Sequence, residues 1–329
     1  MESFIFAVNA VSPIIATVAI GYVLKKIGLM TADFAKRCNK LVFRLFLPVM
    51  LFLNVYKIDT IGGIDMRYIA YSVVMVLVLF FLSIPLVILV ARKRQYRGVL
   101  LQGSFRSNYA LIGIPLAQAL FGDDGVMVAS LLSAAVIPLF NILAVVSLSV
   151  FRTENGKKPS VKHILGDILH NPLIQSIALG VLALGIRAVF SANHIAFLLS
   201  DITPLYTVLG YLSSIATPLA LLSLGAQFEF SAVKELRREI VFGTLMRTVF
   251  VPVFGIGTAY LLFSSQFSGA HFAAFVAMFA TPVAVSSVPM AQEMEGDVAL
   301  AGQLVVWTTI ASAFSVFLVA FLLRAVGVF

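Results

Sequence analysis

The chain has 329 residues, of which 60% are hydrophobic and only 12% are charged, and its mean hydropathy is +1.03. A soluble globular domain needs a wetted polar surface, so this composition excludes that class and indicates a polytopic membrane protein. Cys38 is the single cysteine, which excludes disulfides and thiolate metal clusters within the chain.

About ten apolar segments follow one another along the chain, and most have the ~20 residues that a membrane-spanning helix requires. They lie at roughly 4–24, 39–56, 68–91, 99–121, 126–151, 167–190, 204–226, 240–263, 271–294 and 298–323. The segments are continuously apolar and do not alternate as the strands of a β-barrel would, so we expect an all-α membrane protein. The first segment is full length and follows no basic stretch, which favours a retained helix over a cleaved signal.

Lysine and arginine gather in alternate loops. The basic residues of these loops are Lys25, Lys26, Lys36, Arg37, Lys40, Arg92, Lys93, Arg94, Arg97, Arg152, Lys157, Lys158, Lys162, Lys234, Arg237 and Arg238. The positive-inside rule places these loops in the cytoplasm and both termini outside, in a multi-pass protein of the cell membrane. Topology therefore accounts for the net charge of +8, so the expected partner is the lipid bilayer and not nucleic acid.

The longest polar stretch, FRTENGKKPSVKH at 151 to 163, predicts a cytoplasmic linker over 152–166. The linker separates an N-terminal repeat of five helices, 1–151, from a C-terminal one, 167–329. Because an odd number of helices reverses the direction of the chain, the second unit is expected to be an inverted repeat of the first.

Matching residues support this internal repeat. Pro13 and Gly21 in the first segment are spaced like Pro172 and Gly180 in the sixth. The strongest match joins the fourth and ninth segments, where Pro115, Ala117, Gln118, Gly122 and Asp123 correspond to Pro289, Ala291, Gln292, Gly296 and Asp297. A lone membrane proline indicates a simple kink, but interrupted helices at corresponding places in two inverted repeats indicate a secondary transporter.

We therefore expect helices 4 and 9 to be broken crossover helices. Gly113 and Pro115 predict a break near 112–115, and the stretch between Pro282 and Pro289 predicts another at 283–288. Each break leaves unpaired amides that attract an anion, and carbonyl ends that could hold a cation. The candidate substrate-binding residues are Ser104, Asn108, Gly113, Pro115, Gln118, Ser286, Ser287, Pro289 and Gln292.

Asn108 is the principal candidate, because its amide could donate to a carboxylate at the crossing, although an interhelical hydrogen bond is the alternative. Gln118 and Gln292 could instead cap or pair helices. Arg106 and Arg247 lie about 10 Å inside their segments, where a side chain can snorkel, pair with Glu293 or contact substrate. Asn54, Asn141 and Tyr109 are polar residues whose position the pattern does not define.

No catalytic site is expected, because the chain has neither an HExxH nor a G-x-S-x-G motif and no pair of intramembrane aspartates. No metal ion and no cofactor is expected either. These absences disfavour a membrane-embedded enzyme, which is the alternative from another functional class.

The stretch Asn108-Tyr-Ala-Leu-Ile-Gly-Ile-Pro115 resembles the N-x-x-x-x-G-I-P motif of the fourth helix in the auxin efflux carrier family. The segments ATPVAVSSVPMAQEMEGD, LFLPVMLF and ATPLALLSLGA are similar to the ninth, second and seventh helices of that family. The resemblance implies ten helices in a 5+5 inverted repeat, with helices 1, 2, 6 and 7 as a scaffold. It also implies that Asn108 holds the substrate carboxylate, and that Pro115 and Pro289 are the crossing prolines. The short loop between helices five and six is typical of the bacterial members.

The sequence thus predicts a secondary active transporter of small organic anions, such as dicarboxylates or auxin-like acids, with elevator-type alternating access. A sodium-coupled anion symporter of the bile-acid type is the alternative within the same broad superfamily. The coupling could come from membrane potential alone, from protonation of Glu293 or from sodium at the breaks. The oligomeric state is left open, with a homodimer as one candidate.

Overall fold

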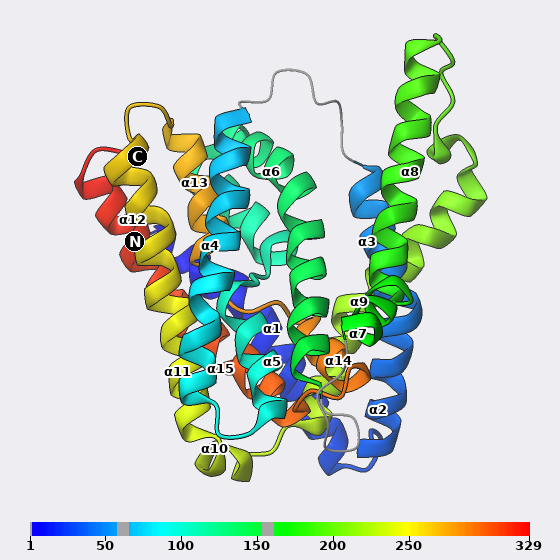
Figure 1. Cartoon of the computed structure of the whole chain (residues 1–329), viewed down its shortest axis with the longest axis vertical. Coiled ribbons are helices and arrows are strands. Elements are labelled where there is room, and N and C mark those ends of the chain that lie inside the picture. Colours follow the sequence, from blue (N-terminus) through cyan, green and yellow to red (C-terminus); the bar gives the residue numbers. More distant parts are fainter. Residues whose placement is uncertain (1, 58–65, 153–160) are drawn as a thin grey trace.

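The computed structural model describes residues 2–57, 66–152 and 161–329, which form a bundle of helices (Figure 1). The first helices are α1 (Glu2–Lys26), α2 (Ala32–Leu41), α3 (Leu47–Tyr56), α4 (Met66–Val90), α5 (Arg94–Phe105) and α6 (Ile114–Phe151). Those that follow are α7 (Val161–Leu169), α8 (Pro172–Ala192), α9 (Thr203–Gln227), α10 (Ser231–Glu235), α11 (Arg237–Leu245), α12 (Val251–Phe263), α13 (Gly269–Phe279), α14 (Ser287–Glu293) and α15 (Val298–Ala325). The short elements are the π-helical turns η1 (Val42–Phe46), η2 (Tyr109–Gly113) and η4 (Met246–Phe250) and the 3-10 turn η3 (Leu199–Asp201). The described residues contain no strand, so the all-α prediction is confirmed.

Seven helical stretches of the described chain are long and apolar enough to cross a membrane. They are Ala32–Tyr56, Met66–Val90, Tyr109–Phe151, Pro172–Ala192, Thr203–Gln227, Arg237–Phe263 and Val298–Ala325. The predicted segments 99–121 and 271–294 are both interrupted. The end of the first continues as α6 into the predicted segment 126–151, with a kink at Gly122 (φ 59°). The count of ten spans therefore stays a prediction. Most of the predicted linker, 153–160, lies outside the described residues.

Each of the three π-helical turns is followed, after one residue, by a proline at the second position of the next helix: η1 by Pro48, η2 by Pro115 and η4 by Pro252. Proline lacks a backbone N–H and clashes with the carbonyl four residues back. In a π turn the backbone hydrogen bonds join residues five apart instead of four, which relieves this clash. The chain therefore stays helical through Pro115, and the break predicted near 112–115 is wrong.

The first interruption lies elsewhere in its helix, whereas the second lies close to its predicted position. The first comprises Arg106–Asn108, between α5 and η2, and the second comprises residues 280–286, between α13 and α14. The second overlaps the predicted break at 283–288, although it begins three residues earlier and α14 resumes at Ser287. The Pro282 region thus breaks its helix, whereas Pro115 does not.

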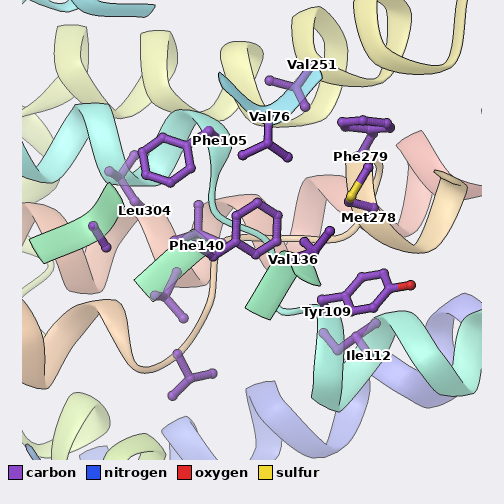
Figure 2. Close-up of a cluster of buried hydrophobic side chains, with 14 of the residues drawn as sticks. Val76, Phe105, Tyr109, Ile112, Val136, Phe140, Val251, Met278, Phe279 and Leu304 are labelled. Carbon is purple, nitrogen blue, oxygen red and sulfur yellow. The ribbon is translucent and has the colours of Figure 1, made fainter. Parts of the chain in front are cut away.

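Apolar side chains fill the space around both interruptions (Figure 2). Phe105 and Tyr109 flank the first interruption and are 2% and 1% exposed, and Phe279 at the end of α13 is also buried. The Tyr109 hydroxyl donates to the carbonyl of Ala129 on α6 at 2.9 Å. Neighbouring helices therefore enclose the irregular backbone, as is required at membrane depth.

Close helix pairs meet at glycines. Gly21 of α1 lies against the backbone of Leu222 on α9, and Gly180 of α8 lies against Val55 of α3, so that an added Cβ would collide at either position. Small residues allow such close approach of membrane helices. The helices α1, α2, α3, α8 and α9 therefore pack closely with one another, while α13 packs on α6 and α5 packs on both α4 and α6.

The described parts of the basic loops lie at one end of the molecule, called the basic side below. In Figure 1 the α4–α5 connection and α10 both lie at the lower end. Side chains tie these loops together: Lys25 donates to the carbonyl of Phe228, and Arg238 donates to that of Leu89. The structure thus gathers residues that the sequence assigned to the cytoplasmic loops.

Candidate functional site

The two interruptions contact each other through their backbones, and together they are called the crossing below. The backbone amide of Asn108 donates to the carbonyl of Pro282 at 2.8 Å, and Ser107 forms an isolated antiparallel bridge with Val283. The amide of Val283 donates in turn to the Thr308 hydroxyl of α15 at 3.1 Å. Some of the backbone groups that the helix breaks expose thus find partners within the protein.

Arg247 binds the carbonyl ends of both broken helices. Its guanidinium donates to the carbonyl of Phe105 at the end of α5 (3.2 Å), to that of Met278 at the end of α13 (2.7 Å) and to that of Thr281 just after α13 (2.7 Å). Each helix C-terminus carries roughly half a negative charge, so two of them balance one guanidinium. Arg247 is fully buried, so the expectation that it snorkels is wrong.

Two adjoining cavities of about 60 and 210 Å³ open beside the crossing. The residues that line both are Leu47, Met50, Asn54, Asn108, Ala110 and Ser286. Arg106 and Asn141 line the smaller cavity and give it a polar end, whereas Ala216 and Ala220 of α9 line the larger one. Among the described residues that line them, Arg106 alone is charged.

Arg106 is 3% exposed, and within the described part of the chain its guanidinium donates to neutral groups. Its guanidinium donates to Asn141 Oδ1 at 2.8 Å, to Ser286 Oγ at 2.7 Å and to Met290 Sδ at 2.8 Å. These contacts join α6 and the second interruption to the first. Arg106 therefore neither snorkels nor pairs with Glu293, and its positive charge lies beside the cavity.

Asn108 lies next to Arg106 in the first interruption and is 9% exposed. Its side-chain Nδ2 is buried and meets no acceptor in the part of the chain that the structure describes. A buried donor without a partner is costly, which makes it a candidate for ligand binding. The interhelical side-chain hydrogen bond considered for this amide is not observed in that part of the chain.

The other candidates of the first stretch lie outside the two cavities. Ser104 is fully buried, and its hydroxyl donates to the carbonyl of Leu100 within α5. Gly113 packs against the backbone of α13, where an added Cβ would lie 2.9 Å from the Ala277 oxygen. Pro115 and Gln118 are exposed on α6.

The candidates of the second stretch divide in the same way. Ser286 lines both cavities, whereas Ser287 and Pro289 are buried in α14 and do not line them. Gln292 accepts from Asn39 Nδ2 at 3.1 Å and donates to the Lys36 carbonyl at 2.9 Å. Glu293 pairs with Arg44 at 3.2 Å, which corrects the predicted pairing with Arg106 or Arg247.

The structure adds cavity residues that the sequence pattern left unplaced. Asn54 of α3 lines both cavities, and Asn141 of α6 lines one of them and orients Arg106. Both asparagines are amides within apolar segments, and this polarity is the sequence feature that could have identified them as cavity residues. Their shared location depends on packing between helices distant in sequence.

Seven apolar helical stretches of membrane length in the described chain, together with two interrupted helices beside a polar cavity, define a helical membrane protein built around a central site. The chain matches a family model described as "Membrane transport protein" over residues 6–160 and 159–320. It therefore belongs to this family of membrane transporters, that of the auxin efflux carriers.

Two curated relatives agree with this assignment. The chain is 26% identical over 327 residues to an uncharacterized transporter of Methanothermobacter thermautotrophicus, with 95% of this chain and 97% of the relative covered. It is also 26% identical over 254 residues to an uncharacterized transporter of Methanocaldococcus jannaschii, with 76% of each chain covered. The relatives thus support a transporter but give no substrate.

Proposed function

We propose that this protein is a secondary transporter of small organic anions, principally carboxylates, and not an enzyme. The observation that carries the proposal is the cavity beside the crossing. There the buried guanidinium of Arg106 has neutral recorded partners, and Nδ2 of Asn108 is an unused donor. A carboxylate would supply both the missing negative charge and the missing acceptor.

The chemistry of the cavity favours a carboxylate over a neutral solute. A charged arginine inside a membrane protein is costly and usually pairs with an opposite charge. Its planar fork matches carboxylate geometry, and charge-assisted hydrogen bonds are stronger than neutral ones. The amides at the start of the helical run from Tyr109 add positive potential on the same side.

The apolar part of the larger cavity limits the rest of the substrate. Ala216 and Ala220 of α9 and Val285 of the second interruption form an apolar wall, while Asn54 and Thr217 supply polar atoms. Such a wall suits a carboxylate with an apolar body, and the amides suit a second polar group. Dicarboxylates and auxin-like acids are therefore both suitable test substrates.

We further propose the 5+5 inverted repeat of 1–151 and 167–329 with elevator-type movement. Equivalent features support it: Gly21 of α1 contacts α9, while Gly180 of α8 contacts α3. Each broken helix also ends near a positive-φ residue, Gly122 (φ 59°) in one and Glu295 (φ 58°) in the other. The close packing of α1, α2, α3, α8 and α9 suits a scaffold against which the crossing moves.

Arg247 argues against the sodium-coupled, bile-acid-type alternative. A sodium ion at the breaks would use the carbonyl ends of the half-helices. The guanidinium of Arg247 already binds three carbonyls there. We therefore propose sodium-independent transport, in a multi-pass cell-membrane protein with its basic side in the cytoplasm and both termini outside.

A panel of carboxylates tests the proposed function. Purified protein is expected to be thermally stabilised by at least one of malate, malonate and indole-3-acetate, and not by the uncharged amide of that acid. The stabilising acid should then cross proteoliposomes at a rate that depends on membrane potential and not on sodium. Stabilisation by the amide as strongly as by the acid, or flux that requires sodium, would contradict the proposal.

A further inference from the structure

The last turn of α14 makes polar contacts that the proposed binding site does not use. The side-chain amide of Gln292 bonds both to the Asn39 side chain and to the Lys36 carbonyl of α2. The next residue, Glu293, is 12% exposed and pairs with Arg44 of η1. Asn39 itself is fully buried. Two successive residues thus hold the second broken helix against α2 and η1.

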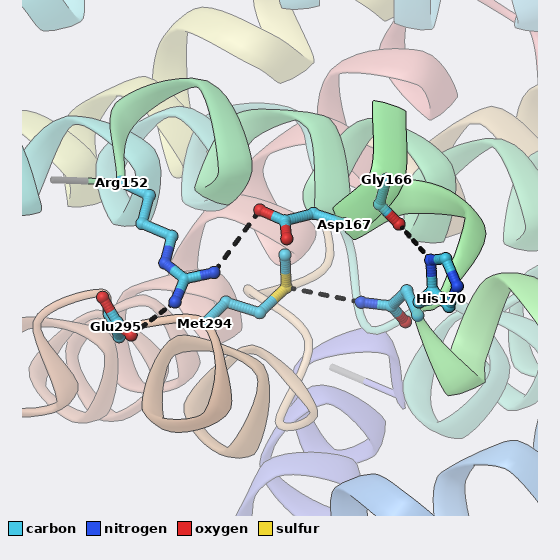
Figure 3. A network of polar contacts seen from close by, with 7 residues as sticks. Arg152, Gly166, Asp167, His170, Met294 and Glu295 are labelled. Atoms are coloured by element: carbon cyan, nitrogen blue, oxygen red, sulfur yellow. Dashed lines mark hydrogen bonds and ion pairs between the residues drawn. The ribbon is translucent and has the colours of Figure 1, made fainter. Parts of the chain in front are cut away.

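A second set of contacts holds the two residues that follow α14 (Figure 3). Met294 accepts from Asn171, which caps α8, at 3.6 Å. Arg152 at the end of α6 pairs with Glu295 at 2.6 Å and with Asp167 of α7 at 3.4 Å. The end of α14 is therefore connected to α6 and α8 as well as to α2 and η1.

These contacts lie between the cavity and the basic side. The cavity residue Ser286 directly precedes α14, and Glu293 ends that helix seven residues later, about 10 Å along its axis. The span Ala32–Tyr56 runs from the basic α1–α2 loop toward the cavity. Lys36 and Asn39 lie in α2 near its start, whereas the cavity residues Leu47 and Asn54 follow in α3. The contact of α14 with α2 and η1 therefore lies on the basic side of the cavity.

We propose that Gln292 and Glu293, with their partners Asn39, Lys36 and Arg44, form a gate that closes the cavity toward the basic side. The gate rests on the proposed alternating access, and it gives these two residues a role other than substrate binding. Only one of its contacts is an ion pair, and the Arg44 side chain is 63% exposed, so the gate can open. The gate opens when the crossing moves relative to α2 and these contacts break.

Cysteine accessibility tests the gate without any transported substrate. In a Cys38→Ser background, Thr217→Cys places a single thiol at the cavity wall on α9. The thiol is labelled with an impermeant sulfonate methanethiosulfonate applied from either side of sealed vesicles. Because labelling needs no carboxylate, failure of the gate can be distinguished from failure of the proposed function.

Arg44→Glu is expected to raise labelling from the basic side about fivefold, because like charges would then repel where an exposed ion pair now attracts. Combining it with Glu293→Arg should restore the wild-type rate to within about twofold, since the pair is re-formed in reverse. Lys40→Glu, an equal charge change on the exposed surface of α2, should leave the rate unchanged. The milder change Glu293→Gln is also expected to raise the labelling rate from the basic side. It replaces the charge-reversal variants if these do not fold.

A cross-link provides the opposite perturbation. Asn39→Cys with Gln292→Cys, oxidised in the same Cys38→Ser background, should abolish labelling of the reporter from the basic side, and reduction should restore it. Unchanged labelling from the basic side in both Arg44→Glu and the oxidised protein would overturn the gate. So would equal labelling rates for Arg44→Glu and its combination with Glu293→Arg.

Discussion

Replacement of Arg106 by glutamine is expected to weaken carboxylate binding about 30-fold or more. Removing one partner of a buried, hydrogen-bonded charge pair typically costs about 2–5 kcal/mol, and each 1.4 kcal/mol is tenfold in affinity. Arg106 is 3% exposed beside the cavity, where water cannot replace the lost charge. Thermal-shift titration with the best-binding acid of the panel measures the change.

Two variants act as controls for this prediction. Arg106→Lys keeps the positive charge but loses the planar fork, so we expect intermediate affinity. Arg324→Gln removes an exposed arginine at the end of α15 and should leave affinity unchanged. Wild-type affinity in Arg106→Gln would show that the guanidinium does not contact the substrate.

Replacement of Arg247 by methionine is expected to lower the free energy of unfolding by about 3–5 kcal/mol, as when a buried ion pair loses one partner. The change leaves the Phe105, Met278 and Thr281 carbonyls without the donor that joins them. It also leaves two helix C-termini facing each other with uncompensated negative ends. Unfolding in a graded series of denaturing detergent provides the measurement.

Arg324→Met is the matched control, because it changes an exposed arginine and should alter stability by no more than about 0.5 kcal/mol. Comparable stability of the two variants would contradict the view that Arg247 joins the broken helices. Arg247→Lys should recover part of the loss, since one ammonium can reach some of the three carbonyls.

The fold class could be predicted because it depends on local composition. Continuous apolar segments of sufficient length predict membrane helices wherever they fold. The exact breaks could not be predicted from proline alone, because η2 lets the helix continue through Pro115 while the chain opens at Arg106–Asn108. The second break lies close to its predicted position, because Pro282 and the serines that follow it all disfavour a helix.

The candidate site was predictable in part for a related reason. Asn108 and Ser286 lie within or beside the interruptions, so local sequence located them next to the cavity. One partner of Arg106 is Asn141, and Glu293 pairs with Arg44; both partners come from helices distant in sequence. Such pairs depend on how distant segments pack, and amphipathic periodicity carries little of that information in continuously apolar helices.

The proposed transport depends on binding of a carboxylate by the Asn108 side chain in the cavity beside the crossing. Asn108→Ala removes the unpartnered Nδ2 but keeps the backbone amide that bonds Pro282, so the fold should be preserved. A hydrogen bond to a charged group is worth about 1.5–3 kcal/mol, so flux at limiting concentrations of the stabilising carboxylate should fall about 10- to 100-fold in proteoliposomes. Wild-type flux in equally well expressed and folded Asn108→Ala protein would contradict this account.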